Sequence, residues 1–342
     1  MRTFIILLAV ALAACSAPTT LHRPPGAGKI IIDEDPGELN DDALATAMLL
    51  DSSQVEVLGI TTVGGNTWPE EGAAYALRLL ELLGRTDIPV IRGATADPRI
   101  RPDGKDYRSL PYAGALARPR PLGYRNLSET PRLGYPTTEP SDATASEFIA
   151  DQVKSHPHQV TILALGPATN LARAIEDHPE IVALVKGVVF MGGAFDVPGS
   201  VTKDAEFNWW WDPRAAEIAL DAPFREKTVI PLDACQELLY DKQIYERVVA
   251  APAAPLSKPL RNLHGSIFAG DPAYNMPVWD TVAAAVFLRP DIVTDTSDRP
   301  VSAEPATGKA VRGASPAHVV SHVDPSRFWD IYVDRLAGGH TS

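Results

Sequence analysis

A short apolar run that leads directly into closely spaced aspartates is the feature that most constrains this chain. The three isoleucines at 30–32 predict a buried strand. Pro36-Gly37 predicts a sharp turn after it, and Asn40 is a suitable N-cap for a helix. Four aspartates lie in this short stretch: Asp33, Asp35, Asp41 and Asp42. Because like charges so close together repel unless a cation neutralises them, the segment predicts a metal or catalytic carboxylate site.

Asp41 and Asp42 also have a simpler explanation, because carboxylates in the first turn of a helix complement its dipole. That explanation does not account for Asp33 and Asp35, which stand at the carboxyl end of the predicted strand. Open α/β sheets bind their ligands at that end of their strands. We therefore favour a functional site over a purely structural role.

Strand and helix signals alternate along the rest of the chain. Strands are predicted at 55–63, 88–94, 159–166, 184–193 and 227–233. Helices are predicted at 70–84, 146–155, 167–176, 212–220 and 279–288. This order predicts an α/β fold: a single large domain whose central sheet is mainly parallel, with helices on both faces. Residues 94–142 show little periodicity, and such a long insertion either covers a site or elaborates the surface.

The first 28 residues are predicted to direct and tether the protein rather than to fold with it. Residues 1–14 place Arg2 before an apolar run, as in a bacterial signal peptide, and the run is too short to span a membrane. Cys15 follows small residues, as in a lipobox, so we predict that it carries lipid and that 15–28 form a flexible tether. A plain signal peptide with an incidental cysteine is the alternative. The predicted location is the bacterial cell envelope, as a membrane-anchored lipoprotein that faces the periplasm or the exterior.

The charge of the chain argues against one class of partner. The formal net charge is −12, and the sequence contains no basic run. A nucleic-acid partner would call for clustered lysine and arginine. Contact with a membrane is therefore expected through the lipid only, and the oligomeric state is left open, a homo-oligomer included.

Several predicted strands end in polar or glycine-rich motifs whose order is informative. After the aspartate-rich segment these are GGNTW (64–68), LGPATN (165–170), MGGA (191–194), AEFN (205–208) and VWD (278–280). The set, in this order, resembles the calcium-dependent nucleoside hydrolases, which cleave ribonucleosides to free base and ribose. The resemblance extends over nearly all of the mature chain, so residues 29–337 are expected to form one nucleoside hydrolase domain.

The resemblance implies a role for each matching position. Asp35 matches the aspartate that binds Ca²⁺ and activates the attacking water. The other implied metal ligands are Asp42, Asp280 and the backbone carbonyl of Leu165. The implied contacts to a nucleoside substrate are Asp41, Asn66, Met191, Glu206, Asn208 and Trp279. The resemblance implies that Asp33 supports the metal ligands without itself binding the metal or the substrate.

The residue types suit this chemistry on independent grounds. Ca²⁺ takes about six to eight oxygen ligands from carboxylates, carbonyls, hydroxyls and water. A water on the cation that is hydrogen-bonded to Asp35 becomes a better nucleophile, and nearby carboxylates stabilise the positive charge that develops on the ribose. Glu206 and Asn208 are two positions apart, so on an extended segment both would face the same side.

The chain departs from the family pattern at three places. Glu38-Leu39-Asn40 lengthen the acidic motif by two residues, and Ser200 replaces an asparagine that contacts the 5′-hydroxyl in many members. Trp279 replaces the histidine of members that act on inosine and uridine alike, and purine-specific members similarly have a tryptophan there. An indole stacks better on a purine than on a pyrimidine, so we predict a purine preference. Trp68 and Tyr274 are candidates for a second aromatic wall, although we favour a core or surface role for each.

Two other functions are weighed against this one. A DxD motif at a strand end also resembles haloacid-dehalogenase-type phosphatases, but these have threonine or valine where this chain has Gly37. A non-catalytic lipoprotein that binds nucleosides or sugars would be expected to lack the water-activating aspartate, and Asp35 is present. The histidine nearest the predicted pocket, His264, could protonate a leaving base, although we favour a structural role for it.

Overall fold

The computed structural model describes residues 28–96 and 112–338. The predicted signal peptide (1–14), the predicted lipidation site Cys15 and the tether up to residue 27 lie outside these ranges. None of the helices within the described ranges is long and apolar enough to cross a membrane.

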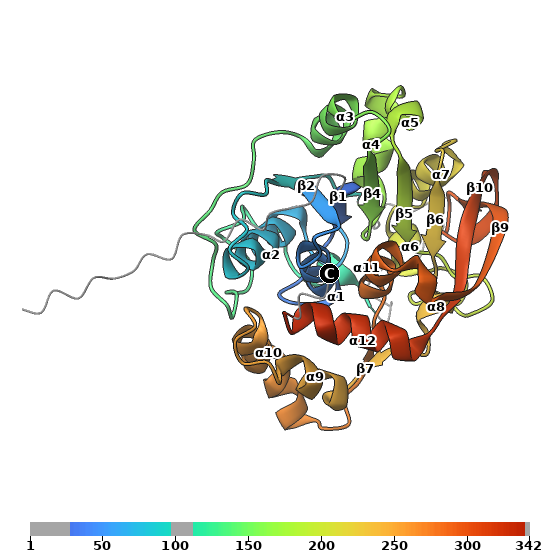
Figure 1. Ribbon diagram of the computed structural model, residues 1–342. Coiled ribbons are helices and arrows are strands. Elements are labelled where there is room, and N and C mark those ends of the chain that lie inside the picture. The colour runs from blue at the N-terminus through green and yellow to red at the C-terminus, as the bar shows by residue number, and fades with distance from the viewer. Residues whose placement is uncertain (1–27, 97–111, 339–342) are drawn as a thin grey trace, which may run out of the picture.

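A central sheet of eight strands runs through the described part of the chain (Figure 1). Its order is β3-β2-β1-β4-β5-β6-β10-β9. The strands are β1 (Gly28–Glu34), β2 (Val55–Thr62), β3 (Val90–Arg92), β4 (Val160–Ala164), β5 (Gly187–Met191), β6 (Lys227–Ile230), β9 (Val293–Ala303) and β10 (Ala310–Val323). Neighbouring strands are parallel except β9 and β10, which are antiparallel. The predicted α/β fold with a mainly parallel sheet is therefore confirmed.

Helices cover both faces of the sheet, because successive side chains of a strand point to opposite sides. Ile30 and Ile32 of β1 belong to one core cluster and Ile31 to the other. The first cluster includes residues of α1 (Asp41–Leu50), α2 (Pro69–Leu82), α8 (Leu232–Cys235), α9 (Lys242–Val249), α10 (Ser257–Gly270), α11 (Asp280–Leu288) and α12 (Pro325–Leu336). The second includes residues of α3 (Ala145–Ser155), α4 (Thr169–Asp177), α5 (Ile181–Leu184) and α7 (Pro213–Asp221).

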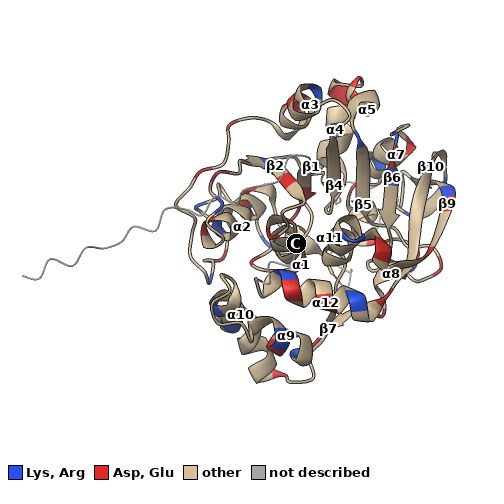
Figure 2. Ribbon diagram, viewed as in Figure 1, with Lys and Arg blue, Asp and Glu red and all other residues tan. Residues whose placement is uncertain are grey.

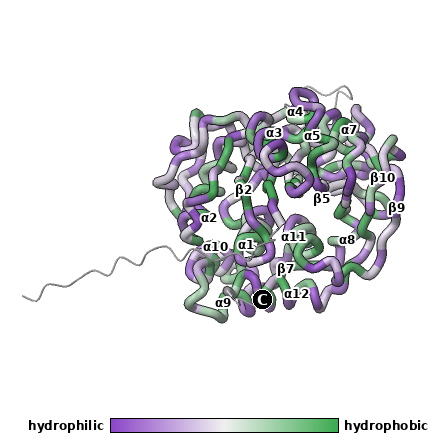
Figure 3. The backbone as a smooth tube through the Cα atoms, turned by 45° about the horizontal axis from the view of Figure 1, so that its top comes forward, coloured by the Kyte–Doolittle hydropathy of each residue, from purple (hydrophilic) through white to green (hydrophobic). Residues whose placement is uncertain are grey.

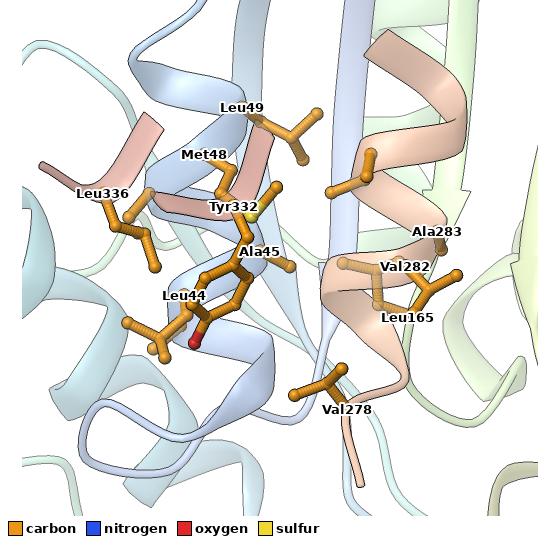
Figure 4. Close-up of a cluster of buried hydrophobic side chains, with 14 of the residues drawn as sticks. Leu44, Ala45, Met48, Leu49, Leu165, Val278, Val282, Ala283, Tyr332 and Leu336 are labelled. Carbon is orange, nitrogen blue, oxygen red and sulfur yellow. The ribbon is translucent and has the colours of Figure 1, made fainter. Parts of the chain in front are cut away.

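Helix α1 is buried over its whole length and anchors the side of the fold that carries the acidic motif. Its Met48 and Leu49 lie in one cluster with Val282 of α11 and Tyr332 of α12 (Figure 4). Both α1 and α11 are largely hydrophobic, whereas many surrounding loops are hydrophilic (Figure 3). The tight packing of α1 against α11 brings the starts of these two helices together.

Several parts of the fold differ from the sequence-based expectation. The β9–β10 hairpin and the helices α9, α10 and α12 were not predicted. Strand β9 forms the edge of the sheet and is mostly polar and partly exposed, so it lacks the apolar run of a buried strand. A small sheet of β7 (Leu239–Tyr240) and β8 (Met276–Pro277) was also missed. In its described part, the insertion contains a short 3₁₀ helix, Gly114–Ala117.

Candidate active site

The predicted site residues lie at the carboxyl ends of neighbouring parallel strands. The chain runs from β1 outward to β2 and β3, and then returns to β4 on the other side of β1. Such a reversal leaves a crevice at the carboxyl ends of the two central strands. Asp35 follows β1, Asn66 follows β2, Leu165 follows β4 and Met191 ends β5. Figure 2 shows acidic residues at this end of β1, in the middle of the fold.

The turn after β1 holds Asp42 against the end of the strand. Asn40 caps α1, as predicted: its side-chain oxygen accepts hydrogen bonds from the backbone N–H of Gly37 (2.8 Å) and of Ala43 (3.3 Å). Its amide donates to Asp42 Oδ2 (2.8 Å), and the backbone N–H of Asp35 donates to Asp42 Oδ1 (3.2 Å). The two aspartates are thus placed beside each other by the turn itself.

The extra residues of the acidic motif fasten this turn to distant parts of the chain. The Glu38 carboxylate accepts hydrogen bonds from the backbone N–H groups of Arg132 and Leu133 in the insertion. Leu39 is buried with a positive φ of 56°, and its carbonyl lies 3.0 Å from His264 Nε2. Because a carbonyl can only accept, His264 Nε2 carries the proton, and its Nδ1 faces the Tyr240 hydroxyl at 3.0 Å. His264 therefore has the structural role that we favoured.

Burial makes the carboxylates costly to charge. It raises the pKa of Asp35 and of Asp280 well above their usual values, and the charge of Asp42 raises both further. Within the described residues, Asp35 Oδ1 and Asp280 Oδ1 are buried and have no hydrogen-bond partner. Unpartnered carboxylate oxygens in a crowd of like charges are suitable donors for a hard cation such as Ca²⁺.

These carboxylates are not already arranged as a finished cation site. In the described part of the chain, no group of three carboxylates, imidazoles or thiols is gathered in a way that could hold a metal ion. The Leu165 carbonyl, the implied backbone ligand, accepts a hydrogen bond from Asn208 Nδ2 (2.6 Å). The fit to Ca²⁺ thus rests on donor chemistry and on the two unpartnered oxygens, and side chains would have to turn to bind it.

Asp41 is engaged at the start of α11. Its Oδ2 accepts hydrogen bonds from the backbone N–H groups of Trp279 and Asp280 (2.6 Å each), and its Oδ1 accepts one from the Thr281 hydroxyl (2.8 Å). Burial raises the pKa of Asp41 to about 6, although these hydrogen bonds oppose the shift. The predicted contact of Asp41 with ribose stays a prediction, because its carboxylate is here used to position Trp279 and Asp280.

Asp33 and Glu34 are fully buried at the end of β1. Asp33 Oδ1 accepts hydrogen bonds from the Thr61 hydroxyl and the Asn170 amide (2.7 Å each), and burial raises its pKa to about 7. Glu34 accepts a hydrogen bond from the Thr46 hydroxyl (2.6 Å). Asp33 thereby links β1 to β2 and to the LGPATN motif, as a supporting residue would.

A cavity of about 220 Å³ opens beside the acidic residues. Its lining residues are Asn66, Tyr112, Leu165, Met191, Ser200, Glu206, Phe207, Asn208, Leu232, Trp279 and Asp280. Seven of the predicted site residues are in this set, and the aspartates at 33, 35, 41 and 42 are not. A larger surface depression of about 480 Å³ near Lys242 and Tyr274 contains none of the predicted site residues.

The prediction that Glu206 and Asn208 lie on an extended segment is wrong. Glu206 is the N-cap of a short helix, α6 (Phe207–Trp211), and accepts hydrogen bonds from the backbone N–H groups of Asn208 (2.8 Å) and Trp209 (3.2 Å). Burial raises the pKa of Glu206 to about 7. The helix forms because its three tryptophans, at 209–211, are all buried. Both polar side chains nevertheless line the cavity.

The two candidates for a second aromatic wall, Trp68 and Tyr274, have the packing role that we favoured for each. Trp68 packs in a separate cluster with Trp210 and Trp211, and Tyr274 packs on Phe268, so neither lines the cavity. Tyr112 and Phe207 line it instead, with ring centroids 5.2 Å apart. Phe207 lies inside the AEFN motif, where the sequence offered a hint. Tyr112 belongs to the insertion, where no periodicity or motif distinguishes it.

Comparisons with known proteins agree with the geometry. Residues 30–330 match a family model described as inosine-uridine preferring nucleoside hydrolase. The chain is 32% identical over 324 residues to the pyrimidine-specific ribonucleoside hydrolase RihA of Salmonella newport, which covers 90% of this chain and 97% of that protein. It is 32% identical over 274 residues to uridine nucleosidase 1 of Arabidopsis thaliana, which covers 78% of this chain and 75% of that protein.

Solved structures give the same picture of the fold. The purine-preferring ribonucleoside hydrolase from Gardnerella vaginalis superposes with a TM-score of 0.71 at 26% identity, over 91% of this chain and 99% of the other. The plant nucleoside hydrolase PpNRh1 superposes with a TM-score of 0.73 at 25% identity, over the same shares of the two chains. The similar proteins thus include both pyrimidine-specific and purine-preferring enzymes.

Proposed function

The chain belongs to the inosine-uridine preferring nucleoside hydrolase family, and we propose that within this activity it cleaves purine ribonucleosides in preference to pyrimidine ones. It is an N-ribosyl hydrolase, which releases free base from a nucleoside. This membership favours hydrolysis over the phosphatase and the binding-only alternatives. The base preference is our own inference, since its relatives differ in the bases that they accept.

The observation that supports a purine preference is the unequal lining of the cavity. Trp279, Phe207 and Tyr112 contribute aromatic rings, whereas Asn66, Glu206, Asn208 and Asp280 contribute polar groups. A nucleoside has the same two parts, a flat base and a polar sugar. Aromatic walls stabilise a stacked ring by about 0.5–1.5 kcal/mol beyond burial of its area, and a purine offers the larger ring system.

The family is typically dependent on Ca²⁺, and we propose that this chain is as well. The carboxylates of Asp35, Asp42 and Asp280 and the carbonyl of Leu165 would hold the ion. When bound, Ca²⁺ would make a water molecule more acidic. Asp35 would accept the proton of the attacking water. Glu206 and Asn208 would hold the sugar while positive charge develops on it.

The test of this proposal is base release from inosine, adenosine, guanosine, uridine and cytidine, with and without a chelator. We expect faster turnover of the three purine nucleosides, and loss of activity on chelation that added Ca²⁺ restores. Trp279→Ala should lose most of the purine preference together with kcat. Trp329 is a matched control, because it is also a half-buried tryptophan but packs on Phe328 and Tyr332, away from the cavity. Faster cleavage of uridine than of inosine by the wild-type protein would refute the purine preference.

We also propose that Cys15 anchors the enzyme to a membrane of the bacterial cell envelope by lipid. The support is the LAAC sequence after a short apolar run and the Pro/Gly-rich tether that follows. Cys15→Ser should release the protein from the membrane fraction and leave nucleoside hydrolysis by the folded domain unchanged. Mass spectrometry that finds an unmodified or absent Cys15 in a soluble wild-type protein would contradict the anchor.

A further inference from the structure

Asn66 stands between the insertion and the acidic residues. Its backbone N–H donates to the Asp35 carboxylate, and its side-chain amide donates to Asp42 Oδ2 (3.3 Å). On the other side it is contacted twice by the insertion: the Tyr112 hydroxyl donates to Asn66 Oδ1 (2.9 Å), and Arg118 Nη2 donates to the Asn66 carbonyl (3.2 Å). Every polar group of Asn66 is therefore used in one network.

The orientation of the Asn66 amide follows from these partners. A carboxylate can only accept, so the nitrogen of the amide must face Asp42. Its oxygen must then face the Tyr112 hydroxyl, which is free to donate. The Tyr112 ring is in turn held against Phe207. Asn66 lines the cavity in this single orientation.

Arg118 is held by a buried partner. Its Nε donates to Glu71 Oε1 (2.8 Å), and the Glu71 side chain is almost completely buried in the first turn of α2. Glu71 Oε2 accepts a hydrogen bond from the backbone N–H of Trp68 (3.0 Å), and the Trp68 indole donates to the Arg118 carbonyl (3.2 Å). A planar guanidinium presents its donors in a rigid fork, so one arm is bound to Glu71 while another reaches Asn66.

We infer that the insertion positions Asn66 for the ribose: Arg118 is a positioning residue that holds its backbone, and Tyr112 orients its amide. This inference rests on the proposed function, because it assigns to Asn66 a contact with the sugar of the nucleoside. The insertion then does more than elaborate the surface. It completes the sugar-binding side of the site from residues 46 and 52 positions away in the sequence.

A neighbouring pair of residues provides a matched control. Arg120 comes from the same segment and pairs with Glu70 of the same helix (2.8 Å), and its guanidinium lies over the Trp68 ring. Both ion pairs therefore join the insertion to α2, but the Arg120 pair is more exposed and its hydrogen bonds go to Glu70. Arg120→Ala weakens the attachment of the insertion without touching Asn66.

The test variant removes the guanidinium of Arg118 without leaving a buried charge unpaired, which would itself destabilise the fold. Arg118→Met combined with Glu71→Gln meets this condition. We expect kcat/KM to fall about tenfold for inosine and uridine alike, the size of a lost charge-assisted hydrogen bond. Inhibition by ribose should weaken by a similar factor, whereas inhibition by free base should not change. Arg120→Ala should stay within about twofold of wild type in all three measurements.

A double-mutant cycle tests the contribution of Tyr112. Tyr112→Phe keeps the ring on Phe207 and removes only the hydroxyl, and we expect kcat/KM to fall about fivefold. In an Asn66→Ala background the same change should have almost no further effect, because the hydroxyl acts through the amide. Equal losses in both backgrounds would mean that Tyr112 acts independently of Asn66 and would overturn its part of the inference.

The inference and the proposed function fail in different ways. If the wild-type protein releases base but the Arg118→Met/Glu71→Gln variant behaves like Arg120→Ala, the positioning role of Arg118 is wrong and the hydrolase is unaffected. If the variant loses activity on only purine or only pyrimidine nucleosides and its inhibition by ribose is unchanged, the insertion contacts the base instead of the sugar. A wild-type protein that releases no base from any nucleoside would overturn both. Thermal unfolding of each variant shows whether it remains folded.

Discussion

Asp35 occupies a space that two neighbouring glycines leave open. A Cβ atom at Gly65 would lie 2.0 Å from Asp35 Oδ2, and one at Gly166 would lie 2.7 Å from Oδ1. These glycines belong to the GGN and LGP motifs at the ends of β2 and β4. Their role is to let the backbone approach the carboxylate closely. The glycines of these two motifs therefore do more than form turns, because they leave room for the carboxylate of Asp35, the proposed general base.

The first prediction concerns Asp35 itself. Asp35→Asn should lower kcat by roughly 10² or more, the range typical of a lost general base. It should not destabilise the metal-free protein, because burial and the charge of Asp42 disfavour a carboxylate at this position. Steady-state kinetics and thermal unfolding measure the two effects.

Variants of the other implied ligands are the control for this prediction. Asp42→Ala and Asp280→Ala should weaken Ca²⁺ binding and regain activity in excess Ca²⁺. Full activity of the exhaustively chelated wild-type protein would contradict the role of the metal in all three.

At the scale of the element, the start of α11 depends on a residue from α1. The Asp41 carboxylate accepts from both backbone N–H groups that open α11 and from the hydroxyl of Thr281. Helix α11 has no cap from its own N-cap residue, Trp279. Because the first N–H groups of a helix lack partners within it, Asp41 replaces the missing cap. The packing of α1 on α11 thus sets the position of Trp279 and Asp280.

The second prediction tests this cap. Asp41→Ala should lower the free energy of unfolding by about 1–2 kcal/mol, as the loss of a helix cap does, and should lower kcat/KM because Trp279 and Asp280 shift. Asp212 is the matched control, since its side chain caps α7 by accepting from the backbone N–H of Ala215. Asp212→Ala should cost similar stability in urea unfolding but leave kcat/KM unchanged. Equal losses of activity in both variants would contradict a specific role of Asp41.

At the scale of the whole molecule, the topology gathers carboxylates that the fold must then bury. The ends of β1, β4 and β5, together with α6 and α11, contribute the acidic and polar groups around the site. Outer helices such as α9 and α12 carry both acidic and basic residues (Figure 2). The buried charged residues, by contrast, are mostly carboxylates, and a cation or protons must balance their charge.

The third prediction is that the stability of the metal-free protein falls as the pH rises. Burial raises the pKa of Asp33 and of Glu206 to about 7 and that of Asp41 to about 6, above the ordinary values of 3.8, 4.5 and 3.8. The folded state then binds more protons than the unfolded state between about pH 4 and pH 7, so the free energy of unfolding decreases over that window. As far as these groups are concerned, the free energy of unfolding is greatest below pH 4, and their contribution is lost as the pH rises through about 7.

Thermal unfolding of chelated protein across this pH range measures the effect, and added Ca²⁺ should raise Tm most at pH 7 and above. A Tm that rises steadily from pH 4.5 to pH 7 without metal would contradict it. Glu81 does not contribute in this window. Hydrogen bonds from Thr137 and Thr138 outweigh its partial burial and lower its pKa from 4.5 to about 2, so its stabilising contribution is lost only at lower pH.

The sequence by itself determined the parts of this protein that depend on neighbours in the chain. Local patterns predicted strand β1 from its isoleucines and the start of α1 from the Asn40 cap. The alternation of strands and helices predicted the mainly parallel sheet. The positions of Asn66, Glu206, Asn208, Trp279 and Asp280 at one site were expected from the order of their motifs. A motif is a pattern of neighbouring residues in the sequence, so it can be recognised before the fold is known.

Only the tertiary structure decided which distant residues complete the site. Tyr112 and Arg118 belong to an insertion without periodicity. Glu71, the partner of Arg118, lies in α2 and is 47 positions away in the sequence. The second half of the AEFN segment, Phe207-Asn208, begins a helix with the buried tryptophans that follow it, whereas Glu206 keeps an extended backbone as the N-cap. Edge strand β9 escaped prediction because its pairing with β10 forms a strand from polar residues. In each case the deciding free energy comes from contacts between segments, which the local sequence does not encode.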